Sequence, residues 1–199
     1  MTAALHLPDD LVDKQDWTVD DLVSLPKDLR YELIDGRLIL PSPTGIHQEI
    51  AWEVIYALRI NCPRRLMMAA DMSLRVDRRN EPRPDVLVYP RKHGTVSPAP
   101  LGSGVLAVEV ISPDSNIRDL HTKPRVYAIA GVPSYWVIDP FHDAGVVLAE
   151  FRLDDTGQYA LLTETAKIFT TEVPFPVTLD LPALTALRQE TIDLSREDE

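Results

Sequence analysis

Two acidic residues, Asp85 and Glu109, lie in segments that otherwise have the composition of buried β-strands. Asp85 opens the apolar stretch "DVLVY", and Glu109 lies inside "GVLAVEVI". A buried carboxylate needs a partner or loses its charge. If the two strands pair, both carboxylates project from one face and repel each other, and a shared divalent cation would keep both ionised. Mg²⁺ suits such a site because it takes one or two carboxylates and keeps waters or phosphate oxygens as its other ligands. One alternative stays open, in which Asp85 caps a turn and Glu109 pairs with an arginine.

Lys123 and Glu32 are the next candidates for a hydrolytic site. Lys123 follows Glu109 by one loop, and Pro124 places it at the cap or first turn of a predicted helix. There it could stabilise negative charge on a reacting phosphate or act on an attacking water, although most lysines at helix edges are solvated. Glu32, in "YELIDG", shares a strand face with Ile34. If that face is the core face, the Glu32 carboxylate is buried and, like Glu109, needs a partner.

His47 is in line with Val54 and Leu58 on a predicted helix, so it faces the core or its edge. A packed histidine and a proton shuttle or phosphate contact are both compatible with this position. The sequence has no Gly-rich phosphate loop, HExxH, CxxC pair or G-x-S-x-G, which excludes the common nucleotide, zinc and serine-hydrolase sites.

The elements that must position these residues alternate between helices and strands. Helical spacing and caps predict helices over 18–25, 46–60 and 119–130. Strands are expected in a hairpin over 30–40 that turns at Asp35-Gly36, and over 71–76, 85–89, 104–111, 134–140, 144–153 and 158–163. The strand that follows the helix over 119–130 should run parallel to strand 104–111. This order predicts an α/β fold, a mixed β-sheet flanked by α-helices.

Composition predicts one domain over residues 1–187, followed by an acidic tail over 188–199 that we expect to fray. The net charge is −11, yet residues 59–93 carry nine basic and four acidic side chains, so this segment could face a polyanion or simply be solvated. One cysteine, no signal peptide and no apolar run long enough for a bilayer indicate a cytoplasmic protein without a membrane partner.

Several of these segments together resemble a known family. The series "YELIDG", a helix with an early histidine, "RPDV", "VEVISPD" and "RDLHTKPRVYAIAGVPSYWVIDP" is similar to the Uma-type restriction endonucleases, formerly a domain of unknown function, of the PD-(D/E)XK nuclease superfamily. The resemblance covers roughly residues 15–185 and is most specific over 109–140.

The resemblance implies a restriction-endonuclease-like core with a metal site at one sheet edge. It assigns Asp85 and Glu109 as the first and second metal-binding acids and Glu32 as an additional acid. The superfamily's lysine stands two residues after the second acid, where this sequence has Ile111, so Lys123 would replace it from the following helix. Tyr127, one turn after Lys123, also matches a recurrent position and could reach the same cleft.

These observations predict a Mg²⁺-dependent endonuclease, with Mn²⁺ as an alternative ion and DNA as the expected substrate. Asp85 and Glu109 would bind the metal, Glu32 would assist, and Lys123 would orient or deprotonate the attacking water. A homodimer is one option, because cleavage of both strands of a duplex usually needs two active sites. Two alternatives remain: a non-catalytic module that binds nucleic acid or protein through residues 59–93, and a nuclease acting on RNA or an unusual DNA end.

Overall fold

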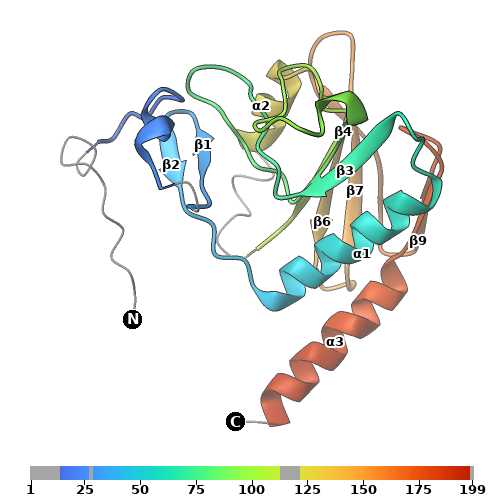
Figure 1. The fold of residues 1–199 in the computed structure, drawn as a ribbon. Helices are drawn as coiled ribbons and strands as arrows, with labels where there is room; N and C mark the ends of the chain where they lie inside the picture. Colours follow the sequence, from blue (N-terminus) through green and yellow to red (C-terminus); the bar gives the residue numbers. More distant parts are fainter. Residues whose placement is uncertain (1–13, 27–28, 113–121, 198–199) are drawn as a thin grey trace.

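A mixed six-stranded sheet forms the centre of the protein (Figure 1). The structure is a computed structural model and describes residues 14–26, 29–112 and 122–197. The strand order is β3-β4-β5-β6-β7-β8, with these bounds: β3 Leu66–Ala70, β4 Val86–Pro90, β5 Leu106–Val110, β6 Ser134–Asp139, β7 Val147–Leu153 and β8 Tyr159–Thr165. Neighbouring strands are antiparallel except β5 and β6, which are parallel and are connected through α2 (Lys123–Ile129). The predicted α/β fold with a mixed sheet is confirmed.

The two faces of the sheet are covered by different helices. Helix α1 (Gly45–Asn61) buries Ile50, Val54 and Leu58 in a core that includes Val108 and Val110 of β5. Helix α2 packs with the alternate residues of the strands, in a core that includes Leu87, Ala107 and Tyr135. Because side chains alternate along a strand, Glu109 points to the α2 face. The sheet therefore places this carboxylate inside the second apolar layer.

A separate hairpin carries Glu32. Strands β1 (Glu32–Ile34) and β2 (Arg37–Ile39) turn at Asp35 and Gly36, whose φ angles are 52° and 77°. Two successive positive φ angles are typical of a tight hairpin turn, and the Asp-Gly pair accepts them readily. Backbone hydrogen bonds of 3.1 and 2.8 Å join Leu33 to Glu81 and so fix the hairpin to the rest of the molecule. The hairpin predicted at this place is confirmed.

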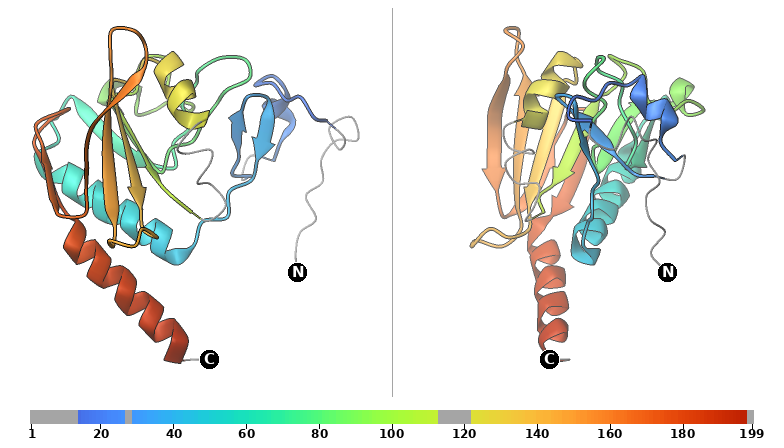
Figure 2. Two further views of the ribbon diagram at one scale, coloured as in Figure 1. Left: turned by 180° about the vertical axis from the view of Figure 1, so that it is seen from behind. Right: turned by 90° about the vertical axis from the view of Figure 1, so that its left-hand side faces the viewer.

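The C-terminal part adds elements that the sequence analysis missed. Strands β9 (Ile168–Thr171) and β10 (Val177–Asp180) form a second two-stranded sheet, and helix α3 (Leu181–Glu197) follows directly. In both views of Figure 2 the C-terminal half of α3 extends beyond the sheet. The expectation of a frayed tail from residue 188 is wrong as far as Glu197, because α3 continues to that residue. Asp180 caps the start of this helix by accepting a 2.9 Å hydrogen bond from the Ala183 N–H.

Two other local predictions differ from the structure. The strand expected over 71–76 lies earlier, as β3, because Asp71 has a φ of 53° that ends the strand; Leu74 makes only an isolated bridge. The helix expected over 18–25 is the short 3-10 helix η2 (Asp21–Ser24), and a second one, η3, spans Arg91–His93. The helix expected over 119–130 is described from residue 122 onward, and its first residues lie outside the described part. No helix of the described residues is both long and apolar enough to cross a membrane.

Candidate active site

Lys123 joins two buried carboxylates from distant parts of the chain. Its Nζ donates to Glu32 Oε1 at 3.1 Å and to Glu109 Oε2 at 2.9 Å. The three residues are only 6%, 1% and 4% exposed for Glu32, Glu109 and Lys123 respectively. Glu32 comes from hairpin β1–β2, Glu109 from β5 and Lys123 from the first turn of α2. The lysine therefore balances part of the negative charge that the fold buries there.

Tyr127 supplies a second partner for Glu109. Residues four apart on a helix share one face, so Lys123 and Tyr127 both point from α2 towards β5. The Tyr127 hydroxyl donates to Glu109 Oε1 at 2.5 Å. Burial raises the pKa of Tyr127 well above its usual value, and the negative charges of Glu109 and Glu32 raise it further. Tyr127 is consequently a neutral hydrogen-bond donor that fixes the position of the Glu109 carboxylate.

Asp85 lies just before β4, next to the end of β5. Its Oδ2 accepts a 2.7 Å hydrogen bond from the Val110 N–H and lies 3.2 Å from His47 Nε2. His47 is on the first turn of α1, where its own N–H donates to the capping Thr44 Oγ1. The Asp85 carboxylate is thus held beside the backbone that follows Glu109.

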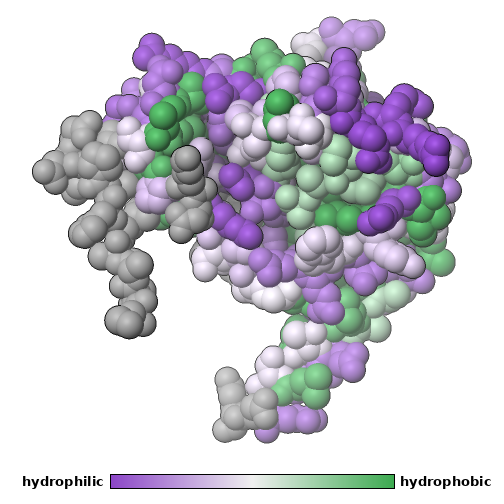
Figure 3. All heavy atoms as spheres, viewed as in Figure 1, coloured by the Kyte–Doolittle hydropathy of each residue, from purple (hydrophilic) through white to green (hydrophobic). Residues whose placement is uncertain are grey.

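All four predicted catalytic residues and His47 line one cavity of about 670 Å³. The cavity lies among hairpin β1–β2, helix α1 and the ends of β3, β4 and β5, and its lining includes Glu32, His47, Asp85, Glu109 and Lys123. Figure 3 shows hydrophilic side chains in the same region, between the hairpin and the body formed by α1 and β3. The structure brings together residues that lie up to 91 positions apart in the sequence.

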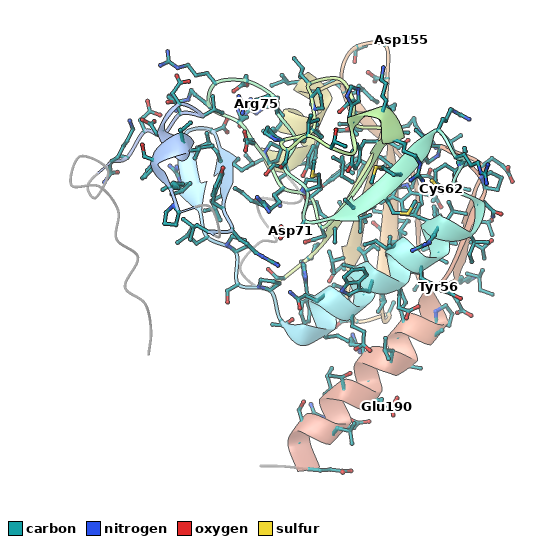
Figure 4. The ribbon with its side chains drawn as sticks, in the orientation of Figure 1. Tyr56, Cys62, Asp71, Arg75, Asp155 and Glu190 are labelled. Atoms are coloured by element: carbon teal, nitrogen blue, oxygen red, sulfur yellow. The ribbon has the colours of Figure 1, made fainter. Side chains whose placement is uncertain are left out.

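The same cavity is also lined by three residues whose place in the site was not predicted from the sequence, Asp71, Arg30 and Arg83. Asp71 lies where β3 ends, on the side of the hairpin β1–β2 (Figure 4). Its Oδ2 is 3.1 Å from Arg30 Nη1 and 3.6 Å from Arg83 Nη1. Burial raises the pKa of Asp71, the positive charges of Arg83 and Arg30 oppose that shift, and the charge of Asp85 adds to it. The one sequence signal was an aspartate after an apolar run, a residue type that accepts a positive φ.

The residues present fit a Mg²⁺ ion that is completed by substrate or water. No three or more His, Cys, Asp or Glu side chains of the described residues are arranged as a ready metal cage. Mg²⁺ rarely uses such cages and needs only one or two carboxylates. Asp85 Oδ1 has no hydrogen-bond partner among the described residues, and Asp85 and Glu109 line one cavity. Oxygen donors of this kind suit a hard cation such as Mg²⁺ or Mn²⁺.

Comparisons with known proteins agree with this architecture. A family model described as "Uma2: Putative restriction endonuclease" matches residues 19–186. A solved structure described as "a putative nuclease belonging to DUF820" from Anabaena variabilis ATCC 29413 superimposes with a TM-score of 0.66 at 18% identity, covering 86% of this chain and 98% of that one. No curated protein matches. The structural likeness supports the fold, and the family model covers most of the chain, including all the candidate residues.

Proposed function

Since this chain belongs to the Uma2 family, whose model is described as "Putative restriction endonuclease", we propose that it is a Mg²⁺-dependent nuclease of the PD-(D/E)XK type that hydrolyses phosphodiester bonds of DNA. The observation that carries the proposal is the position of Lys123 Nζ between Glu32 and Glu109, in a cavity that also contains Asp85. Two metal-binding carboxylates and a nearby cation are what metal-assisted phosphate hydrolysis requires.

In the proposed site Asp85 and Glu109 would hold Mg²⁺, with Mn²⁺ as an alternative. The bound ion would make a coordinated water more acidic and polarise the phosphate group. The Val110 N–H and the His47 side chain hold Asp85 Oδ2, so Oδ1 would be the oxygen of Asp85 that binds the ion. The Tyr127 hydroxyl holds Glu109 Oε1 and limits rotation of that carboxylate.

Lys123 orients the attacking water and stabilises the charge that develops on the phosphate. The carboxylates of Glu32 and Glu109, at 3.1 and 2.9 Å, stabilise its positive charge. An ammonium held in this way donates hydrogen bonds, so we favour orientation of the water over its deprotonation by Lys123. Glu32 has an indirect part: it fixes the Lys123 side chain from the hairpin side.

The alternative, a non-catalytic module that binds through the basic segment 59–93, receives less support. Several of its arginines are engaged within the protein: Arg75 pairs with Glu81, Arg78 with Asp20 and Arg79 with Asp16. Arg91 donates to the backbone carbonyls of Arg64 and Leu66. The pairs with Asp20 and Asp16, which lie outside the segment, lower its excess positive charge from five to three, and Arg91 is held by backbone carbonyls.

The test is cleavage of supercoiled plasmid DNA by the purified protein with Mg²⁺ or Mn²⁺, with chelator as the negative control. We expect Asp85→Asn and Glu109→Gln to abolish cleavage and Lys123→Met to slow it by roughly 10²- to 10³-fold. Asp155→Asn is the matched control, because Asp155 lies on an exposed loop far from Asp71 in Figure 4.

Each result of this assay has a defined meaning. Cleavage that survives Glu109→Gln, or that persists in chelator at constant salt, contradicts the proposed mechanism. Cleavage of RNA but not DNA under the same conditions supports the proposed catalytic site and identifies RNA, not DNA, as the substrate.

A further inference from the structure

Arg83 is a cation fixed at the wall of the active-site cavity. Its side chain is 19% exposed, and its guanidinium carbon lies 5.8 Å from the centre of the Tyr31 ring. Its Nη1 donates to the Asp71 carbonyl oxygen at 3.0 Å. An arginine held by stacking and by a backbone bond has already lost most of its rotational freedom, so it binds an anion at a lower entropic cost.

The opposite edge of the Arg83 guanidinium has no partner among the described residues. Nε is buried without a hydrogen bond, and Nη2 makes none in that part of the chain. The nearby carboxylate of Glu81 is engaged by Arg75, whose Nε lies 3.0 Å from Glu81 Oε2. Nη2 is the donor of this edge that a ligand can reach, and a small turn of the guanidinium would let Nε join it in the planar fork that binds phosphate oxygens in pairs. A buried donor without a partner is costly, and a ligand that supplies the acceptor removes that cost.

Asp71 holds Arg83 and a second arginine at the same place. One oxygen, Asp71 Oδ2, lies within 3.6 Å of Arg83 Nη1 and 3.1 Å of Arg30 Nη1. Arg30 is 65% exposed, so it can move with little loss of packing. The Asp71 N–H also donates to the Asp85 carbonyl oxygen at 3.2 Å, which joins this group directly to the proposed metal ligand.

We propose that Arg83, assisted by Arg30, binds a phosphate group of the nucleic-acid substrate at the open edge of its guanidinium, while Asp71 orients both arginines. The choice of a nucleic acid as ligand rests on the proposed function. The phosphate bound here is a neighbour of the one that is hydrolysed, and it fixes the strand relative to Asp85.

The charge of the cavity indicates that the metal ion binds before the phosphate. Its described lining carries four carboxylates, of Glu32, Asp71, Asp85 and Glu109, and three cationic side chains, of Arg30, Arg83 and Lys123. Counting these seven groups as ionised and leaving His47 out, the described lining carries one net negative charge, which disfavours a phosphate. One bound divalent cation reverses the sign to one net positive charge. Phosphate binding at Arg83 should therefore depend on the metal.

The experiment measures binding of a short fluorescein-labelled DNA by fluorescence anisotropy, with Ca²⁺ in place of Mg²⁺ to prevent cleavage. We expect Arg83→Gln to weaken binding roughly 10- to 100-fold and to lower the slope of log affinity against log salt by about one. Asp71→Asn should tighten binding roughly three- to tenfold, because the negative charge next to both arginines is removed and asparagine also accepts a positive φ. Arg78→Gln, which changes an exposed arginine paired with Asp20, is the matched control and should have no effect.

The outcomes separate this proposal from the proposed nuclease activity. Unchanged DNA binding in Arg83→Gln, or weaker binding in Asp71→Asn, overturns the phosphate site even if the wild type cleaves DNA. If DNA binding depends on Arg83 but the wild type does not cleave DNA, the phosphate site is supported and the proposed nuclease activity is contradicted. Absence of wild-type binding to both DNA and RNA oligonucleotides overturns it as well. Since Arg83→Gln could unfold, the opposite effect expected of Asp71→Asn provides an independent test.

Discussion

Replacing Lys123 by methionine tests the charge balance at the centre of the site. The substitution keeps a long apolar stem and removes the ammonium that lies 3.1 Å from Glu32 and 2.9 Å from Glu109. Both carboxylates remain buried, at 6% and 1% exposure, without this partner. We therefore expect Lys123→Met to be folded at neutral pH but strongly destabilised.

The expected loss of stability in Lys123→Met follows from the burial of the two carboxylates. Removing one partner of a buried ion pair costs about 3–5 kcal/mol, and here two carboxylates lose the same cation, so the upper end applies. For a chain of this length each kcal/mol lowers the melting temperature by about 2–4 °C, so a fall of about 10–20 °C is expected. Saturating Mg²⁺ should restore part of the stability, about 2.7 kcal/mol at a hundred times the dissociation constant, if Glu109 binds the ion.

The assay is urea denaturation in chelator and in Mg²⁺, followed by circular dichroism. Lys167→Met is the matched control, because Lys167 is exposed, and it should change stability little. The double variant Lys123→Met, Glu109→Gln should recover part of the loss, since one of the two buried charges is gone. A loss below about 1 kcal/mol in Lys123→Met would refute the reasoning, because a cation between two buried carboxylates cannot be removed so cheaply.

Three further predictions concern Tyr127, the proposed metal ligands and Asp21. Tyr127→Phe should lower the free energy of unfolding by about 1–3 kcal/mol in the same denaturation assay, because Glu109 loses a buried donor. Titration calorimetry should detect Mg²⁺ and Mn²⁺ binding to the wild type and none to the Asp85→Asn, Glu109→Gln double variant. Asp21 accepts hydrogen bonds from Lys14 and Thr18, which lower its pKa from 3.8 to about 2. Its stabilisation is present above pH 3.8 and is lost as the pH falls through about 2, so Asp21→Asn should cost up to about 1 kcal/mol at neutral pH and nothing below pH 2.

Elements with strong local signals could be predicted from the sequence. The Asp35-Gly36 pair predicts the hairpin, the apolar spacing predicts α1, and the strand after α2 is parallel to β5 as expected. The C-terminal helix α3 was missed because its start signal, Asp180 before Leu181-Pro182, lies in a segment that resembles the approach to an acidic tail. Helix α3 is stabilised at its start by burial of Leu181 and Leu184, which is a tertiary effect.

Part of the candidate site could be predicted from the sequence, because some of its residues also have strong local signals. Glu109 is conspicuous because a charged residue interrupts an apolar strand, and Lys123 can be placed because Pro124 begins a helix. Asp71 could not be found, since its partners Arg30 and Arg83 come from other segments and since its φ of 53° ends a strand of ordinary composition. Contacts between residues far apart in the sequence depend on the tertiary fold, which no local sequence pattern predicts.

Burial of Glu109 can be explained without a metal, and this explanation strengthens the case for one. Lys123 and Tyr127 give its carboxylate a cation and a hydrogen-bond donor, so the fold can form while no ion is bound. The described lining of the cavity nevertheless carries four carboxylates against the three cationic groups of Arg30, Arg83 and Lys123, and Asp85 Oδ1 accepts no hydrogen bond from a described residue. A structural ion pair would be most stable with its charges matched. An excess of negative charge kept next to a cavity of about 670 Å³ is what a site needs in order to attract a divalent cation and then a phosphate.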